Sequence, residues 1–271
     1  MTPNHEHATP RQITVPQFTA FKAAGRKISM LTAYDHTLAA LLDATGIEGI
    51  LVGDSLSMVV QGHPNTLHVT LDEIIYHAEM VGRAVRHALV VVDLPFPCGH
   101  LGRRDSVSSA GRILKETHCQ AVKLEGGVEQ AETIAALVAA GIPVMAHCGL
   151  RPQSVHQLGG YKVQRDADRL LADARAAEQA GAFAMVLECI PAELATQITA
   201  AVGVPTIGIG AGAGCDGQVL VTHDMLGLTD GYVPRFAKAY ADLRGTITEA
   251  VVRYRDEVRG GQFPDAKRAF K

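Results

Sequence analysis

Short and nearly uninterrupted apolar runs recur along the chain from about residue 28 to residue 225. They are rich in β-branched residues and alternate with segments whose apolar residues have helical spacing. Apolar strands separated by helices indicate a parallel sheet that is covered on both faces. Eight runs fit this description: ISMLTAYD (28–35), GILVGDS (49–55), LVVVDLP (89–95), QAVKLEG (120–126), IPVMAHC (142–148), FAMVLEC (183–189), VPTIGIG (204–210) and GQVLVTHD (217–224).

The segments between these runs carry the signals of helix ends. Thr70 and Glu73 form a capping box ahead of an apolar stripe that extends to Val85. ETIAALVAAG (132–141) and DADRLLADARAAEQAG (166–181) each stop at a glycine, which can adopt the left-handed conformation that ends a helix. A further long helix is predicted from about Ala239 to Arg259, and the segment PQFTAFKAAG (16–25) precedes the first run.

Eight strands with intervening helices predict a (β/α)8 TIM barrel, for which about 250 residues suffice. An open, doubly wound sheet is the alternative, but its first strand is normally followed by a glycine-rich turn, and here that turn reads AYDHT. We expect a single domain: a flexible N-terminal tail at residues 1–13, a catalytic barrel at 14–264 that includes the long C-terminal helix, and a C-terminal tail at 265–271.

Composition narrows the class of partner. The 271 residues are 47% hydrophobic and 20% charged, and 25 Lys and Arg are scattered among 28 Asp and Glu, giving a formal net charge of −3. No basic stripe predicts binding to nucleic acid or to a membrane, so a small-molecule partner is favoured.

The N-terminus, the lengths of the apolar runs and the cysteines predict where the protein is located and whether its thiols are reduced. The polar N-terminus and the lack of any run of ~18 apolar residues predict a soluble, intracellular protein. The 5 cysteines include no C-x-x-C pair, which favours reduced thiols.

Charged residues stand at the ends of four of the apolar runs: Asp54, Asp93, Lys123 with Glu125, and Glu188. Charge beside an apolar strand interior is costly unless it is paired. In a closed barrel the carboxyl ends of the strands meet on one face, where barrel enzymes keep their active sites. Because alternate side chains share a face, Lys123 and Glu125 are predicted to point inward together, and Glu188 inward with Val186.

These side chains predict a metal-dependent chemistry. Asp54, Asp93 and Glu125 offer hard oxygen ligands, which suit Mg²⁺ or Mn²⁺ better than Zn²⁺. A 2-oxo acid could chelate such an ion, which would stabilise an enolate. Lys123 could stabilise the same oxyanion, and Glu188 is the candidate general base if burial raises its pKa toward neutrality.

Structural roles compete with these interpretations. A single acidic residue at a strand end is more often a helix cap or a loop anchor, although five ionisable groups together favour function. His147 is interpreted as a hydrogen-bonded core or outer-sphere histidine rather than as a ligand. The run GIGAGAG (208–214) could bind a phosphate through backbone N–H groups or could form a tight loop at the barrel rim.

Several segments closely resemble one known family, the ketopantoate hydroxymethyltransferases. The resemblance runs from about Thr14 to Phe263, with the motifs in the same order. They are TAYD (32–35), VGDS (52–55), TLDE (70–73), AVKLEGG (121–127), RPQSVHQLGGYKVQ (151–164), LECIPAELA (187–195) and IGIGAGAGCDGQVLV (207–221).

The resemblance implies a transferase of pantothenate biosynthesis that moves a one-carbon unit from methylenetetrahydrofolate to 2-oxoisovalerate, giving ketopantoate. It implies a barrel with one Mg²⁺ per subunit, assembled as a homodecamer in the cytoplasm. Carried over by position, the metal ligands are Asp54, Asp93 and Glu125, and the general base is Glu188. The groups that bind the 2-oxo acid are Asp54, Ser55, Asp93 and Lys123.

The chain departs from the family pattern at LPFPCGH (94–100) and MAHCGLRP (145–152), where MPFGSY-like and MGHIGLTP strings are expected. These departures affect the shape of the barrel rim and the folate contacts, and not the three carboxylates. Two alternatives stay open: a magnesium-dependent carbon–carbon lyase or mutase of the phosphoenolpyruvate mutase type, and a non-catalytic barrel that senses a 2-oxo acid or folate. The absence of a K-K-C-G-H-like string disfavours the lyase, and the intact charged groups disfavour the sensor.

Overall fold

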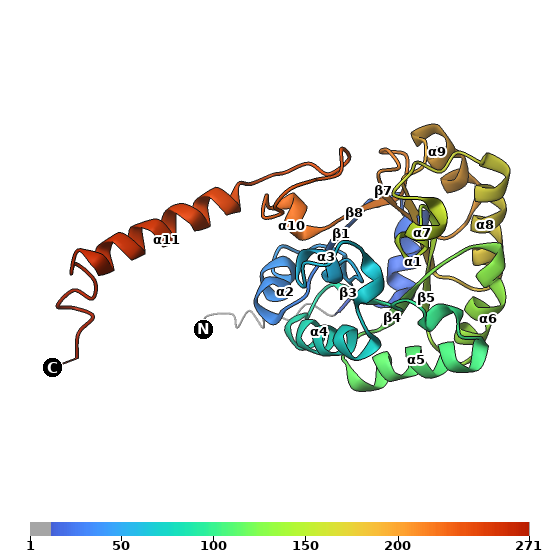
Figure 1. Cartoon of the computed structure of the whole chain (residues 1–271). Coiled ribbons are helices and arrows are strands. Elements are labelled where there is room, and N and C mark those ends of the chain that lie inside the picture. Colours follow the sequence, from blue (N-terminus) through green and yellow to red (C-terminus); the bar gives the residue numbers. More distant parts are fainter. Residues whose placement is uncertain (1–11, 271) are drawn as a thin grey trace, which may run out of the picture. The chain divides into compact units, whose positions relative to one another are not determined.

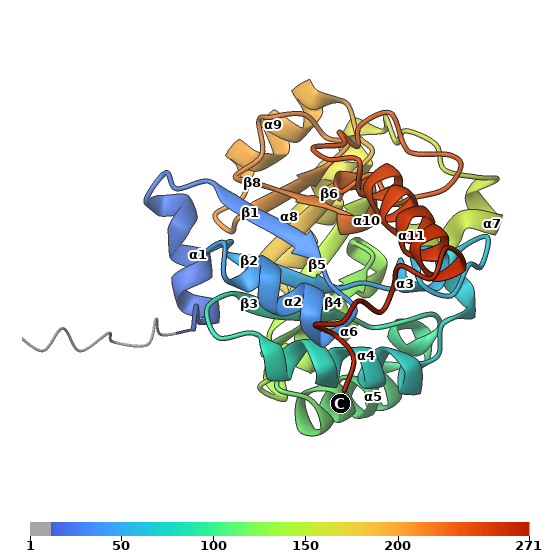
Figure 2. The same ribbon diagram turned by 90° about the vertical axis from the view of Figure 1, so that its left-hand side faces the viewer.

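A closed barrel of eight parallel strands forms the centre of the structure, a computed structural model that describes residues 12–270 (Figure 1). The strands pair in chain order, and the last pairs with the first, so that β8 and β1 lie side by side in Figure 2. The predicted barrel is therefore confirmed, and the open sheet is excluded. The strands are β1 (Ile28–Thr32), β2 (Gly49–Val52), β3 (Leu89–Asp93), β4 (Ala121–Glu125), β5 (Val144–Gly149), β6 (Ala184–Glu188), β7 (Thr206–Ile209) and β8 (Gly217–Leu220).

The predicted helix signals are seen at the expected places. Glu73 accepts a hydrogen bond from the Thr70 backbone N–H (2.7 Å) while its own N–H donates to Thr70 Oγ1, and Gly141 has the left-handed φ of 81°. The α-helices up to β7 are α1 (Val15–Ala23), α2 (His36–Asp43), α3 (Leu56–Val59), α4 (Leu71–Ala84), α5 (Arg103–Glu116), α6 (Ala131–Ala139), α7 (Val155–Leu158), α8 (Ala167–Gln179) and α9 (Ala192–Ala201). Short 3-10 turns are η1 (Thr66–His68), η2 (Cys98–His100), η3 (Val128–Gln130) and η4 (Pro152–Ser154).

Alternation along the strands separates two apolar cores. Val91 and Val186 belong to the core inside the barrel, which Phe18 of α1 and Phe183 extend with an edge-to-face ring contact. Leu124 and Leu187 belong to the larger core between the strands and the surrounding helices. The inner core fills the barrel, so polar residues on the same faces are left for the carboxyl ends of the strands.

The chain divides into two compact units, one ending at Leu220 and the other beginning at Val221. The second unit contains α10 (Thr222–Met225) and α11 (Leu243–Arg259). The helix α11 starts four residues later than the predicted Ala239, because Asp242 caps it by accepting a hydrogen bond from the Gly245 N–H. The domain limits 14–264 stay a prediction.

The ends of the chain are described only in part. Most of the predicted tail 1–13 lies outside the described residues, as does Lys271 of the predicted tail 265–271. Ile13 is buried and its N–H donates to the His87 carbonyl (2.7 Å). Between residues 12 and 270, no helix is both long and apolar enough to cross a membrane.

Candidate active site at the carboxyl ends of the strands

The residues predicted from the strand ends come together at one mouth of the barrel. Asp93 ends β3, Glu125 ends β4 and Glu188 ends β6, while Asp54 follows β2 by two residues. Asp93 pairs in register with Lys123 on the neighbouring strand. All of these side chains are buried except that of Glu188, which is half-buried. As the alternation predicts, they share the inner face with Val186 and not the outer face with Leu124.

Direct contacts link these side chains across five strands. The Asp54 backbone N–H donates to Asp93 Oδ2 (2.9 Å), and Asp93 Oδ1 lies 3.2 Å from Lys123 Nζ. Lys123 Nζ lies 3.0 Å from His147 Nδ1, and His147 Nε2 lies 3.1 Å from Glu188 Oε2. Residues that are far apart in sequence therefore form one connected group.

Negative charge exceeds positive charge in this group, and the pKa values of three of its carboxyl groups are raised. Burial, then the charge of Asp93, raises the pKa of Asp54 to about 7. Burial raises the pKa of Glu188 to about 7 although Lys123 opposes the shift, and burial followed by the charge of Asp54 raises the pKa of Glu125 well above its usual range. Four carboxylates around one ammonium group would be stabilised by an added cation.

His147 is a neutral link between the lysine and Glu188. Burial, with the charge of Lys123, lowers its pKa well below the usual range. Because Lys123 Nζ has only protons to offer, His147 Nδ1 must accept, and the ring proton is then carried by Nε2, which faces Glu188. The interpretation of His147 as a hydrogen-bonded core residue agrees with this geometry.

Ser55, predicted to bind substrate, lies at the same mouth against a buried tyrosine. Its Oγ is 2.7 Å from the hydroxyl of Tyr34, and an added Cβ on Gly53 would come within 3.5 Å of Asp93 Oδ2 and 2.8 Å of Ser55 Oγ. Burial is the main cause that raises the pKa of Tyr34, so the phenol keeps its proton and can hold the serine hydroxyl. Tyr34 belongs to the TAYD segment, but no role was predicted for it from the sequence.

Gln153 is a second residue at this site for which the sequence predicted no role. It lies in η4, after β5, and is buried. Its side-chain Nε2 donates to Asp54 Oδ2 (2.9 Å) and to the Leu94 carbonyl (3.0 Å), and its backbone N–H donates to Glu125 Oε2 (3.1 Å). The RPQSV string contained this residue, but no charge or spacing marked it as functional.

Glu125 Oε1 is buried without a hydrogen-bond partner, and Asp93 Oδ1 has only its ion pair with Lys123 Nζ at 3.2 Å. Buried carboxylate oxygens that lack a hydrogen bond call for an explanation, and a hard divalent cation is one that fits. No group of three or more His, Cys, Asp or Glu residues between 12 and 270 could hold a metal ion directly. Mg²⁺ usually takes one or two carboxylates and keeps several waters, so the three predicted ligands fit an ion held partly through water.

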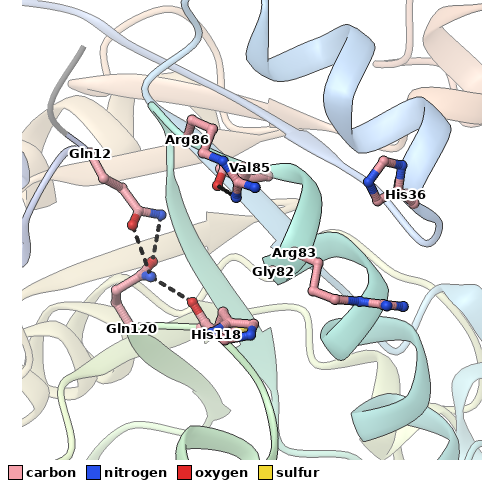
Figure 3. Close-up of a pocket in the computed structure, with 9 residues that line it drawn as sticks. Gln12, His36, Gly82, Arg83, Val85, Arg86, His118 and Gln120 are labelled. Atoms are coloured by element: carbon pink, nitrogen blue, oxygen red, sulfur yellow. Dashed lines mark hydrogen bonds between the residues drawn. The ribbon is translucent and has the colours of Figure 1, made fainter. Parts of the chain in front are cut away.

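Other candidate features lie away from this mouth. A groove of about 750 Å³ is lined by Arg86, His118 and Gln120 among others (Figure 3), in segments that lead into the amino ends of β3 and β4. Gln12 and Gln120 bind each other there. None of the predicted site residues lines this groove, and the amino end of a barrel usually serves stability.

The glycine run after β7 packs closely against α9. A Cβ on Gly214 would come within 2.1 Å of Thr196 Oγ1, and one on Gly212 within 2.5 Å of the Ala192 Cβ. These contacts support the tight rim loop that was one of the two interpretations of this run.

Sequence comparisons show that the chain is similar to one protein family. The family model for ketopantoate hydroxymethyltransferase matches residues 12–266. A 3-methyl-2-oxobutanoate hydroxymethyltransferase from Rhodopirellula baltica is 58% identical over 260 residues, which cover 96% of this chain and 97% of the relative. One from Desulforapulum autotrophicum is 53% identical, covering 96% of this chain and 99% of the relative.

Comparison with solved structures gives the fold. A phosphoenolpyruvate phosphomutase from Streptomyces platensis subsp. rosaceus superposes with a TM-score of 0.63 at 16% identity, covering 96% of this chain and 92% of that one. A phosphonopyruvate hydrolase solved with oxalate and Mg²⁺ gives a TM-score of 0.60 at 15% identity, with coverage of 96% and 92%. At these identities the likeness extends to the barrel alone.

Proposed function

The chain belongs to the ketopantoate hydroxymethyltransferase family, and on this premise we propose that it transfers a hydroxymethyl group to 3-methyl-2-oxobutanoate, giving ketopantoate. Methylenetetrahydrofolate is the proposed one-carbon donor. The observation that carries the proposal is the group of four carboxylates around Lys123, three of them buried and Glu188 half-buried, at the mouth where barrel enzymes keep their chemistry. The reaction belongs to pantothenate and coenzyme A biosynthesis.

Asp54, Asp93 and Glu125 are proposed to hold one Mg²⁺ per subunit, some of them through water. Glu125 Oε1, which is buried without a hydrogen-bond partner, supports this assignment, as does Asp93 Oδ1, which has only the ion pair with Lys123. When bound there, a divalent cation would polarise the carbonyl of a chelating 2-oxo acid.

The 2-oxo acid is proposed to lie against Asp54, Ser55, Asp93 and Lys123. Lys123 supplies the only ammonium group among these residues and is held by Asp93 at 3.2 Å, so its charge is fixed beside the place where an oxyanion would develop. The charges of Asp93 and Glu125 outweigh burial and raise the pKa of Lys123, so the lysine stays protonated and can donate.

Glu188 is proposed as the general base that removes the proton from the carbon next to the carbonyl. Burial raises its pKa to about 7, which suits a base at neutral pH. His147, at 3.1 Å, orients the carboxylate. The carbon freed of its proton then bonds to the methylene carbon supplied by the folate; the carbon–nitrogen bonds of that methylene group break, tetrahydrofolate leaves, and one water molecule supplies the hydroxyl group. The apolar core of the barrel lies below the site and excludes water from that side.

Assembly into a decamer, a cytoplasmic location and the extent of the catalytic domain stay predictions that rest on the family resemblance. We expect small-molecule substrates and no nucleic-acid or membrane partner. The non-catalytic sensor stays an alternative that turnover would exclude.

One experiment tests the central proposal. Purified protein is incubated with 3-methyl-2-oxobutanoate and methylenetetrahydrofolate, with and without Mg²⁺ after chelation, and ketopantoate is measured by mass spectrometry. The expected result is ketopantoate only when the folate and the metal are both present. Product formed at full rate without any divalent cation would contradict the metal role, and binding without turnover would support the sensor.

The alternative activity, a carbon–carbon lyase or mutase on 2-oxo acids, is favoured only by the likeness of the barrel to phosphoenolpyruvate phosphomutase. It predicts cleavage of a 2-oxo acid without folate. Product analysis in the absence of folate separates the two activities, because the transferase would then give only proton exchange and no cleavage.

A further inference from the structure

The geometry points to Gln153 as a positioning residue that sets how tightly Asp54 and Glu125 bind a divalent cation. This inference rests on the proposed function, because it takes these carboxylates as metal ligands. It assigns a role to a residue that is neither charged nor at a strand end.

The side chain of Gln153, in the loop after β5, contacts the segments that follow β2 and β3. Its Nε2 group donates one hydrogen to Asp54 Oδ2 at 2.9 Å and the other to the Leu94 carbonyl at 3.0 Å. Leu94 directly follows Asp93, so the same amide group holds the ends of β2 and β3. The carboxylate oxygen of Asp54 and the carbonyl oxygen of Leu94 both accept hydrogen bonds. The amide of Gln153 is therefore oriented with its nitrogen, and not its oxygen, toward them.

The backbone of Gln153 holds the third proposed ligand. Its N–H donates to Glu125 Oε2 at 3.1 Å. One residue of the β5 loop therefore reaches carboxylates that lie 99 and 28 positions away in the sequence. The residue is only 9% exposed, so these bonds are shielded from water.

These bonds decide which oxygen of each carboxylate is left for an ion. Gln153 occupies Oδ2 of Asp54 and Oε2 of Glu125, while the Asp54 backbone N–H occupies Oδ2 of Asp93. Of the remaining oxygens, Glu125 Oε1 has no hydrogen-bond partner and Asp93 Oδ1 has only the ion pair with Lys123 Nζ. Each proposed ligand thus has one oxygen anchored by a protein donor, as outer-sphere partners of metal ligands commonly do.

The test uses Gln153→Met, which keeps the length and burial of the side chain but removes both side-chain donors. The backbone N–H to Glu125 stays in place. Outer-sphere substitutions weaken metal binding by about 10- to 100-fold, and we expect a loss in this range for MgCl₂ measured by isothermal titration calorimetry without substrate. We also expect the Mg²⁺ concentration for half-maximal turnover to rise by the same factor, with activity recovered at saturating Mg²⁺.

The matched control is Gln130→Met. Gln130 is also a buried glutamine of a loop at this end of the barrel, but its side chain binds His100 Nδ1 (2.6 Å) and none of the carboxylates. We expect its Mg²⁺ affinity to stay within twofold of the parent protein. Should Gln153→Met fail to fold, Gln153→Asn keeps a buried amide that is too short for both bonds and serves the same measurement.

The outcomes separate this inference from the proposed function. If the parent protein binds Mg²⁺ and Gln153→Met binds it equally well, the role of Gln153 is refuted and the proposed function stands. If turnover of the variant falls and excess Mg²⁺ does not restore it, the effect is structural and the inference also fails. If the parent protein binds no divalent cation and works without one, both fail.

Discussion

His147 Nε2 lies 3.1 Å from Glu188 Oε2, and its Nδ1 lies 3.0 Å from Lys123 Nζ. A neutral imidazole in this position separates the ammonium group from the proposed base. A direct Lys–Glu ion pair would hold the carboxylate in its charged form and lower its pKa. With the ring between them, Glu188 keeps a pKa of about 7.

Replacing Glu188 by Gln tests the base directly. We expect the variant to lose proton exchange at the branched carbon of 3-methyl-2-oxobutanoate by about 10²- to 10⁴-fold, the usual contribution of a general base. Magnesium binding should be largely unchanged, because Glu188 is not a proposed ligand. Exchange is measured by NMR in D₂O with the folate omitted. Exchange at the parent rate would remove Glu188 from this role.

Replacing His147 by Asn tests the orienting contact. An asparagine is too short to link Lys123 with Glu188, so the carboxylate should lose its fixed position and kcat should fall by about 10- to 100-fold, the range seen for outer partners of site residues. KM for the 2-oxo acid should change little, because His147 is not among the proposed substrate ligands. Steady-state kinetics checks this split. A rise in KM at constant kcat would assign His147 to substrate binding instead.

Local patterns in the sequence were enough to predict the barrel and most of the residues at the carboxyl ends of its strands. The two-residue period of a strand places Lys123 and Glu125 on one face with Leu124 on the other, and the structure agrees because that period is a property of the backbone alone. The shared orientation of parallel strands then brings Asp93 and Glu188 to the same end.

Contacts between loops could not be predicted in the same way. Gln153 reaches Asp54 across 99 positions of sequence, and no periodicity encodes the path of the β5 loop that brings it there. The start of α11 was also misplaced, because the capping by Asp242 competes with helical propensity in the residues before it. Charge at a strand end is visible in a sequence, whereas a neutral amide in a loop gives no such signal.

Gly149 links the fold to the site, since it pairs with Glu188 across β5 and β6. Its φ is 100°, and a Cβ there would lie 2.3 Å from the Glu188 carbonyl oxygen. We expect Gly149→Ala to destabilise the protein by about 1–3 kcal/mol from backbone strain, more if the clash is not relieved, and to lower kcat because Glu188 must move. Thermal unfolding and kinetics measure the two effects.

Gly46→Ala is the matched control for this substitution. Gly46 also has a left-handed φ, 81°, but a Cβ there meets no atom within 4 Å. The control should lose stability through strain alone and keep its kcat. Equal kcat values in the two variants would show that Gly149 does not position the base.

Glu48 provides a test of pH dependence at the amino end of the barrel. Its carboxylate accepts hydrogen bonds from the backbone N–H and the hydroxyl of Ser29, at 2.8 and 2.7 Å, and from Arg26 Nη2 at 2.7 Å. Burial alone would raise the pKa of Glu48, but these bonds outweigh it and the pKa is lowered. The charged form is therefore bound more strongly in the folded protein than in the unfolded chain.

The stability that comes from Glu48 is complete above the unfolded pKa of about 4.3 and is lost as the pH falls through the lower folded value. We expect Glu48→Gln to reduce the free energy of unfolding by about 1–3 kcal/mol at pH 7, because hydrogen bonds to a charged group are replaced by weaker ones. The difference between the two proteins should shrink toward pH 3, where the parent carboxylate takes up a proton. Urea unfolding at both pH values measures it, and a difference that grows on acidification would contradict the lowered pKa.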